Sequence, residues 1–130
     1  PTDVLDQACR VLDALIFDIK CLDSARHKKA TGVGSELILK NIGHVFEHFP
    51  DLPVLIRTPV IPGFNDTEED ILGIREMIPR KANIRYEALT YHRMGQPKYG
   101  YLGRRYELEG VKADEAFMKR LNIMLKSYEK

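Results

Sequence analysis

Apolar residues along this chain gather in short strand-like runs that alternate with longer stretches in which they recur every three or four positions. Residues 14–17, ALIF, do not alternate with polar residues, which is typical of a strand covered on both faces in a parallel sheet, whereas the three-to-four spacing is typical of helices with one buried face. The strand-like runs are residues 14–19, 54–61 and 84–89. The helix-like stretches are residues 3–11, 35–49, 67–78 and 114–128. The pattern predicts an α/β fold in which three parallel strands carry covering helices.

The connections between the expected strands are long, and no hairpin signal separates the strands. Connections of that length suit β-α-β crossovers, which join parallel strands. A complete (β/α)8 barrel takes roughly 250 residues. Three strands in 130 residues therefore make about half of such a barrel. We expect residues 1–130 to form a single domain with an exposed sheet edge, corresponding to the later portion of an incomplete barrel.

Several local signals mark where the expected elements begin and end. Ser35 precedes the second helix-like stretch as a candidate cap, and Thr67 with Asp70 forms a capping box before the third. Pro59 and a second proline shortly after it each lack an amide hydrogen, so we expect the second strand to leave the sheet near Pro59. Residues 93–111 hold four glycines and three tyrosines, which predicts a long functional loop that aromatic side chains keep ordered.

Composition narrows the class of protein. Hydrophobic residues make up 44% of the chain and charged residues 30%, as in an ordinary globular domain. The net charge of +1 gives no support for a general binder of polyanions. No apolar run approaches the roughly 20 residues of a membrane span and no signal-peptide pattern opens the chain, so we expect a cytoplasmic protein. Cys9 and Cys21 are isolated thiols, which we expect to be reduced and which cannot by themselves hold an iron–sulfur cluster.

Charged side chains and one imidazole lie at the ends of the three strand-like runs. Asp18 and Lys20 are two positions apart, so they share one side of a strand with their backbones roughly 6.6 Å apart and can pair or grip one ligand. Arg57 stands where the second strand meets a proline, and its planar fork suits a carboxylate. His92 follows the third strand. Because parallel strands end at one edge of a sheet, we expect these four groups to gather into a site.

Two other motifs suggest different chemistry. Residues 18–23 fit the D-x-K-x-x-D pattern of the orotidine-monophosphate decarboxylase group, although the chain has no Gly-rich phosphate loop to accompany it. His44 and His48 lie in an H-x-x-E-H sequence on an expected covering helix, where two imidazoles one turn apart need a further ligand to form a metal site. A decarboxylase-like half-barrel that uses Asp18 and Lys20, and a non-catalytic interaction module, remain as alternatives.

Three segments in order along the chain resemble the radical S-adenosylmethionine activating enzymes of glycyl radical enzymes, the pyruvate formate-lyase activating enzyme family. The segments are FDIK at 17–20, IRTPVIPGFND at 56–66 and YHRMGQPKY at 91–99, followed by the tail YELEGVK at 106–112. The resemblance implies the C-terminal half of a partial (β/α)6 barrel. It also implies that the full-length enzyme reduces S-adenosylmethionine at a [4Fe–4S] cluster to a 5′-deoxyadenosyl radical, which abstracts a hydrogen atom from a glycine of the partner enzyme.

The resemblance assigns cofactor-binding roles to five residues of this sequence. Asp18 is similar to an aspartate near the methionyl carboxylate of S-adenosylmethionine, and this aspartate also helps to hold a monovalent cation. Lys20 and Arg57 resemble polar contacts to the cofactor. Leu89 and His92 resemble the groups that lie against its adenine. The resemblance assigns no catalytic residue to this chain.

The resemblance also implies partners. Gly95 and Lys98 would border the glycine loop of a glycyl radical enzyme such as pyruvate formate-lyase. An electron donor such as flavodoxin or ferredoxin would supply electrons to the iron–sulfur cluster. Neither nucleic acid nor a membrane is expected as a partner. The chain departs from the family in having no C-x3-C-x2-C motif and no Gly-Gly-Glu segment. Both features belong to the earlier half of the barrel, so we expect a preceding part of the protein to bind the cluster and this chain to be inactive alone.

Overall fold

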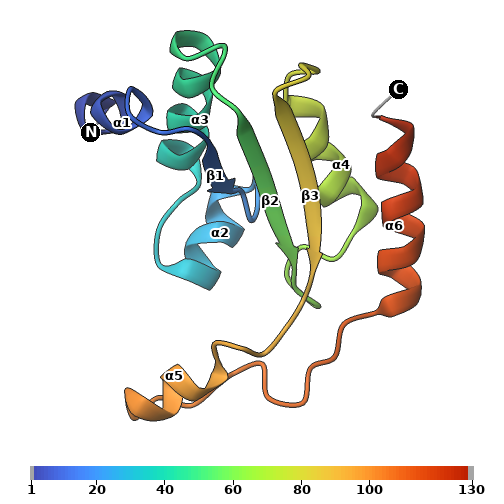
Figure 1. The fold of residues 1–130 in the computed structure, drawn as a ribbon. Helices are drawn as coiled ribbons and strands as arrows, with labels where there is room; N and C mark the ends of the chain where they lie inside the picture. Colours follow the sequence, from blue (N-terminus) through green and yellow to red (C-terminus); the bar gives the residue numbers. More distant parts are fainter. Residues whose placement is uncertain (1, 129–130) are drawn as a thin grey trace.

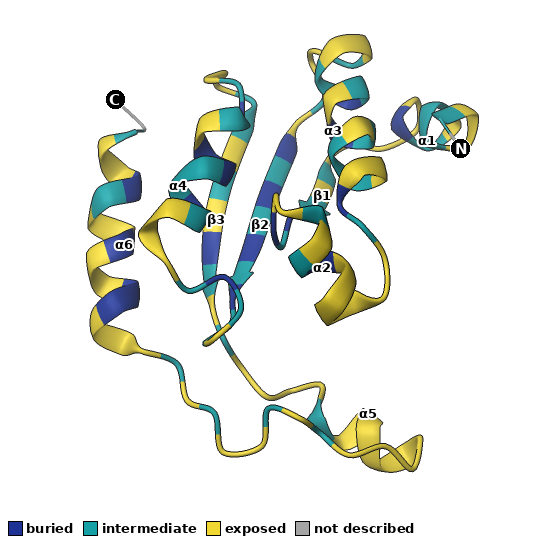
Figure 2. Cartoon of the chain, turned by 180° about the vertical axis from the view of Figure 1, so that it is seen from behind, coloured by how far each residue is buried: buried dark blue, intermediate teal, exposed yellow. Residues whose placement is uncertain are grey.

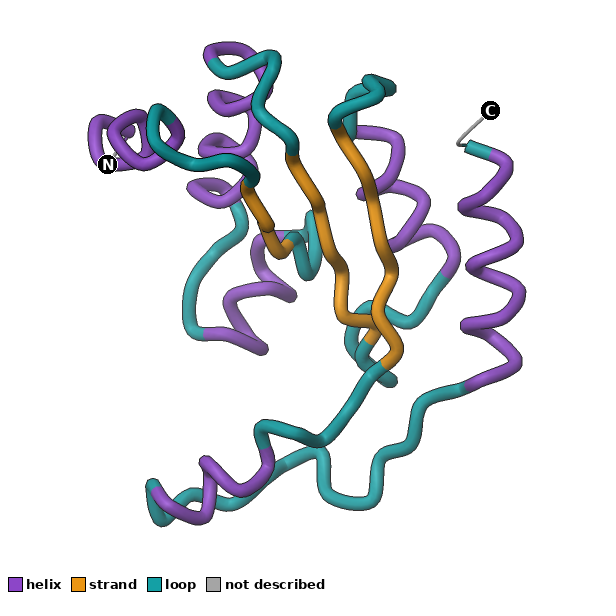
Figure 3. Tube along the Cα trace, viewed as in Figure 1, coloured by secondary structure: helices purple, strands orange, loops and turns teal. Residues whose placement is uncertain are grey.

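Three parallel strands form the centre of the fold (Figure 1 and Figure 3). The computed structural model describes residues 2–128. The strands are β1 (Leu15–Asp18), β2 (Val54–Val60) and β3 (Ile84–Thr90), and they lie in the order β1-β2-β3. Both neighbouring pairs are parallel, with Leu15 opposite Val54 and Val54 opposite Ile84. The α/β class expected from the hydrophobic pattern is therefore confirmed.

Helices cover one face of this sheet. The helices of the described residues are α1 (Thr2–Cys9), α2 (Ser24–Thr31), α3 (Glu36–His48), α4 (Glu68–Met77), α5 (Gln96–Tyr101) and α6 (Glu115–Ser127). Helices α2, α3 and α4 lie behind the sheet in Figure 1 and in front of it in Figure 2, while α6 runs beside β3. Within the described residues the opposite face of the sheet carries no helix. No helix in this part of the chain combines the length and the apolar character needed to cross a membrane.

The alternation of burial along β2 shows which side chains face the helices. Every second residue from Val54 to Val60 is buried, and the residues between them are half-buried. Ile56 is fully buried and packs in a cluster with Ile42 and Val45 of α3 and Ile74 of α4. The core therefore lies between the central strand and these two helices.

A second cluster attaches α6 to the rest of the fold. Leu121 is fully buried, and it packs with Phe117 of the same helix against Ile71 of α4 and Ala88 of β3. Asp114 precedes the helix and its side chain accepts a hydrogen bond of 2.8 Å from the Phe117 amide, as expected of an N-cap. The apolar stripe expected between residues 114 and 128 is confirmed as core packing.

The prediction that the second strand leaves the sheet near Pro59 holds for its pairing with β1 but is wrong for its pairing with β3. β2 continues to Val60 and still pairs with β3 there, whereas its pairing with β1 ends at Arg57. In a parallel ladder the amides of alternate residues point to opposite neighbours. The carbonyl of Arg57 points to β1, because it accepts the Ile19 amide at 3.0 Å. The amide that Pro59 lacks would also have pointed to β1, so only that ladder is interrupted.

Two smaller expectations also change. Ser35 precedes α3 but makes no side-chain cap, because its buried hydroxyl donates instead to the Leu22 carbonyl at 2.9 Å. The loop at 93–111 contains the short helix α5, which lies beyond the carboxyl ends of the strands and apart from the sheet (Figure 1). The expected aromatic ordering is present, since the hydroxyls of Tyr91 and Tyr106 lie 2.5 Å apart and the Tyr106 ring packs edge-on against Tyr99.

Candidate functional site

Asp18 and Arg57 meet at the carboxyl edge of the sheet. They occupy directly opposite positions in the register of β1 and β2. Nε and Nη2 of Arg57 each donate to Oδ1 of Asp18 at 3.1 Å. Two donors on one carboxylate oxygen fix the plane of the guanidinium relative to β1. The contact joins residues 39 positions apart in the chain, as the strand-end argument predicted.

Lys20 completes this contact. Its Nζ donates to the second oxygen of Asp18, Oδ2, at 3.3 Å. The side chains of Asp18, Lys20 and Arg57 are 35–36% exposed, so a ligand can reach all three. Two cations and one anion give this cluster a charge of +1, and such a set can accept a carboxylate. We call these three residues the strand-end cluster.

The remaining predicted cofactor residues, Leu89 and His92, lie at the same edge of the sheet. Leu89 is opposite Pro59 in the β2–β3 register and is half-buried. Because side chains alternate along a strand, Leu89 projects from the same uncovered face as Arg57. His92 stands two positions beyond the end of β3 and is exposed. No hydrogen bond or ion pair among residues 2–128 connects His92 to the cluster.

Gly95 and Lys98 lie on the segment that contains α5. Gly95 precedes this helix and Lys98 lies within it, and both are exposed. The segment also exposes large apolar side chains, with Met94 at 78%, Tyr101 at 86% and Leu102 at 68%. It is thus an exposed apolar and basic element that borders the carboxyl edge of the sheet.

One neighbour of the cluster was not anticipated from the sequence. Glu87 lies opposite Arg57 across the β2–β3 register, so an acidic group flanks the arginine on each side. Glu87 is exposed, and within the described residues it makes no ion pair with Arg57. The alternation of side chains along a strand could have predicted the position of Glu87, because Glu87 and Leu89 are two positions apart and therefore share one face.

The loops behind the cluster are held by a second ion pair that sequence patterns did not indicate. Arg26 of α2 uses both terminal nitrogens to bind the carboxylate of Asp70 at the start of α4, and it donates to the Phe64 carbonyl at 3.2 Å. Burial acts to raise the pKa of the Asp70 carboxyl, but hydrogen bonds from Arg26 and Thr67 outweigh it and hold that pKa below its usual value of 3.8. The folded protein therefore favours the ionised form.

We expect Asp70→Asn to destabilise the protein by about 1 kcal/mol near neutral pH, because the partly exposed Arg26 loses its charged partner. A carboxyl with a lowered folded-state pKa contributes its full stability above its unfolded value and loses that contribution as the pH falls through the lower, folded value. The difference in melting temperature between wild type and Asp70→Asn should therefore be largest at neutral pH and shrink below about pH 4. A pH-independent difference would contradict this assignment.

The part of the chain that the structure describes offers no site for a metal cluster. Within residues 2–128 no group of three or more His, Cys, Asp or Glu side chains is arranged to hold a metal ion. Cys9 and Cys21 are both buried and free, as expected of reduced thiols. His44 and His48 stack with their ring centroids 4.0 Å apart, and Nε2 of His44 lies 2.6 Å from Asp6 of α1. The contact of His44 with Asp6 joins α3 to α1, whereas His48 contacts its own helix through the His44 carbonyl at 3.0 Å.

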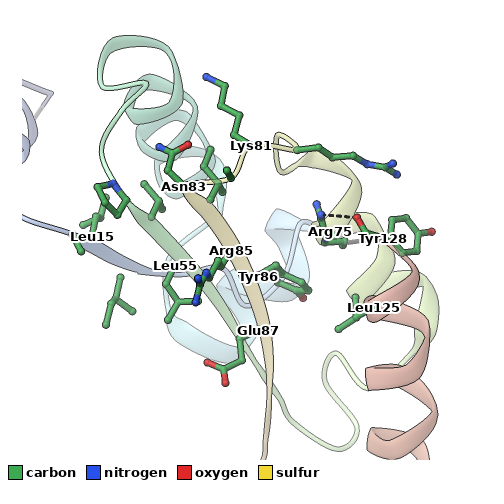
Figure 4. A pocket seen from close by; sticks show the side chains of 17 residues that line it. Leu15, Leu55, Arg75, Lys81, Asn83, Arg85, Tyr86, Glu87, Leu125 and Tyr128 are labelled. Carbon is green, nitrogen blue, oxygen red and sulfur yellow. Dashed lines mark hydrogen bonds between the residues drawn. The ribbon is translucent and has the colours of Figure 1, made fainter. Parts of the chain in front are cut away.

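One large hollow in the structure is not lined by the strand-end cluster itself. It has a volume of about 1260 Å³, begins at the amino ends of the strands near Leu15 and Asn83, and extends along β3 as far as Glu87 (Figure 4). None of the residues predicted to bind the cofactor lines it. Ligands of parallel sheets bind outside the carboxyl ends of the strands, so the strand-end cluster and not this hollow is the candidate site.

The known proteins that the chain resembles are activating enzymes. It is 99% identical over 130 residues to the (2S)-3-sulfopropanediol sulfolyase activating enzyme of Bilophila wadsworthia (strain 3_1_6), covering 100% of this chain and 43% of that protein. It is 43% identical over 123 residues to the isethionate sulfite-lyase activating enzyme of Nitratidesulfovibrio vulgaris, covering 95% of this chain and 40% of that protein. The chain thus spans less than half the length of these curated relatives.

A solved structure supports the same relationship. A crystal structure of a domain of pyruvate-formate lyase-activating enzyme from Bacteroides vulgatus matches with a TM-score of 0.73 and 26% sequence identity. The match covers 98% of this chain and 70% of that one. No family model matches the chain.

Proposed function

We infer that this chain, which is a partial member of the glycyl radical enzyme activating enzyme family, forms the part of such an enzyme that holds S-adenosylmethionine. The observation that carries this proposal is the contact of Asp18, Lys20 and Arg57 at the carboxyl edge of a parallel sheet. In the complete protein these 130 residues would be the C-terminal half of a partial barrel, with the uncovered sheet face turned to the barrel interior. The complete protein would be the enzyme, and this chain alone would be inactive.

The residues present fit the amino-acid end of the cofactor. Lys20 and Arg57 can bind its carboxylate, and Asp18 orients both cations and is also available to a monovalent cation. Leu89 and His92 offer an apolar surface and an imidazole that can stack on the adenine. When bound, S-adenosylmethionine would accept one electron from the cluster held by the remainder of the complete protein and would supply, with release of methionine, the 5′-deoxyadenosyl radical that takes a hydrogen atom from glycine.

The iron–sulfur cluster does not fit this chain. Both described thiols are buried, and one or two thiolates are too few for a [4Fe–4S] cluster. We propose that the cluster is bound by the remainder of the complete protein, where an electron donor such as flavodoxin or ferredoxin would reach it. A cytoplasmic location is part of the same proposal.

The proposed partner is a glycyl radical enzyme. The name of the relative with 99% identity points to a (2S)-3-sulfopropanediol sulfolyase as the particular target. Gly95 and Lys98 would contact its glycine loop, because they lie on an exposed segment that borders the candidate site. Exposed Met94, Tyr101 and Leu102 give this segment the apolar surface that a protein partner could cover.

The experiment that tests this function is anaerobic reconstitution of the complete protein with iron and sulfide. With a reductant, S-adenosylmethionine and the sulfolyase, we expect formation of 5′-deoxyadenosine and a glycyl radical signal in electron paramagnetic resonance. The 130-residue chain under the same conditions should give neither product. The lysine variant Lys98→Glu should lower glycyl radical formation while leaving 5′-deoxyadenosine formation without the partner unchanged.

The alternatives predict other outcomes. A non-catalytic interaction module would give no cofactor cleavage in the reconstituted protein, and that result would refute the proposal. A decarboxylase-like half-barrel would bind phosphate esters at Asp18 and Lys20. Neither of the two relatives compared above is an orotidine-monophosphate decarboxylase, which favours the activating-enzyme interpretation.

A further inference from the structure

Pro59 leaves a gap in the hydrogen bonding between β1 and β2 just behind the strand-end cluster. The last ladder bond joins the Ile19 amide to the Arg57 carbonyl at 3.0 Å. In a parallel ladder the next bond would come from the amide of residue 59 to the carbonyl of Ile19, but proline has no amide hydrogen. The hydroxyl of Thr58, which is fully buried, donates to that carbonyl instead at 2.7 Å.

Asn65 supplies the hydrogen bonds one residue further along. Its Nδ2 donates to the Lys20 carbonyl at 2.7 Å and to the Pro59 carbonyl at 2.9 Å, while its Oδ1 accepts from the Ile61 amide at 2.7 Å. The side chain is fully buried, so both amide hydrogens and the amide oxygen are used. The turn that brings Asn65 back contains Gly63 with a positive φ of 77°.

We propose that Thr58 and Asn65 are positioning residues that replace the ladder bonds lost at Pro59 and so hold Asp18 and Lys20 in place beside Arg57. Their role in cofactor binding rests on the proposed function, whereas their role in fixing the end of β1 does not. Thr58 anchors the carbonyl of Ile19 and Asn65 anchors the carbonyl of Lys20.

The strand-end cluster needs such an external support. Its three side chains are about one-third exposed, and exposed ion pairs contribute only about 0–1 kcal/mol, which is too little to order two long side chains. Lys20 also lies beyond the last residue of β1, so ladder pairing does not hold it. The anchored carbonyls keep residues 18–20 extended, which places the side chains of Asp18 and Lys20 on one side while Ile19 is buried on the other.

The chain contains a matched control for Asn65. Nδ2 of Asn83 also donates to two backbone carbonyls, those of Pro50 and Leu52, each at 2.9 Å. Asn83 precedes β3 and therefore lies at the opposite end of the sheet from the cluster. Asn83→Asp removes the same kind of bridge without touching the end of β1.

The test uses the complete protein with four variants: Thr58→Val, Thr58→Ser, Asn65→Asp and Asn83→Asp. The first readout is hydrogen–deuterium exchange of residues 15–22 without any ligand. We expect faster exchange there in Thr58→Val and Asn65→Asp, wild-type exchange in Thr58→Ser, and a change confined to residues near 50–54 and 81–84 in Asn83→Asp. Because Thr58→Val preserves side-chain shape, it keeps the test valid if Asn65→Asp does not fold.

The second readout is the dissociation constant of S-adenosylmethionine by titration calorimetry. We expect Thr58→Val and Asn65→Asp to weaken binding roughly 10- to 100-fold, the scale of a misplaced contact, with Thr58→Ser near wild type and Asn83→Asp within about twofold of it. Unchanged exchange at 15–22 in Thr58→Val would overturn the inference, and so would equal losses of affinity in Asn83→Asp and Asn65→Asp. A wild-type protein that binds no S-adenosylmethionine would refute the proposed function, while the exchange result would still decide the structural role of Thr58 and Asn65.

Discussion

Arg57→Ala in the complete protein is expected to weaken S-adenosylmethionine binding about 10- to 150-fold, because one charge-assisted hydrogen bond contributes about 1.5–3 kcal/mol. The variant removes the guanidinium that two hydrogen bonds hold on Asp18. Asp18 and Lys20 would then neutralise each other, and no surplus positive charge would remain for a carboxylate. Titration calorimetry measures the change.

Two further substitutions sharpen this experiment. Arg57→Lys keeps the charge but loses the planar fork, so its affinity should lie between those of wild type and Arg57→Ala. Arg85→Ala is the matched control, since Arg85 projects from the same uncovered face of the sheet but lies opposite Leu55, nearer the start of its strand. Equal losses of affinity in Arg85→Ala and Arg57→Ala would argue against a specific contact at Arg57.

Leu121→Ala is expected to lower the free energy of unfolding by about 2–5 kcal/mol, the cost of emptying a buried leucine site. Leu121 is fully buried where α6 packs against α4 and β3. Urea unfolding followed by circular dichroism gives the value. Ile123→Ala on the same helix is the control, because Ile123 is 65% exposed and its loss should change stability by less than about 0.5 kcal/mol. Similar costs for the two variants would contradict the packing of α6 described above.

The sequence pattern was sufficient for the architecture. Short runs rich in apolar residues identified β1, β2 and β3, and the three-to-four spacing identified the faces of α3, α4 and α6, because both signals depend on which side chains are buried. The expectation that the first strand is covered on both faces is wrong, since Ile16 is 56% exposed on the face that carries no helix within the described residues. The strand-end rule also anticipated the meeting of Asp18 with Arg57, since parallel strands end at one edge. The same rule placed His92 in that site, and this part stays a prediction, because His92 lies beyond the strand on a segment with its own conformation.

The supporting contacts were not accessible to the same reasoning. Asn65 bonds to a carbonyl 45 residues away, and Arg26 binds an aspartate 44 residues away. Neither residue belongs to a local pattern that specifies its partner. From the sequence, Asn65 is expected only to be an ordinary turn residue. The one available clue was chemical, since a proline at position 59 requires another donor for the carbonyl it leaves unpaired.

The most direct test of the central claim is a crystal structure of the complete protein with S-adenosylmethionine bound. The proposal predicts that the methionyl carboxylate lies within hydrogen-bonding distance of Lys20 or Arg57 beside Asp18, with the adenine against Leu89 and His92. Cofactor bound elsewhere in the complete protein, with Asp18, Lys20 and Arg57 left in contact only with one another and solvent, would contradict it.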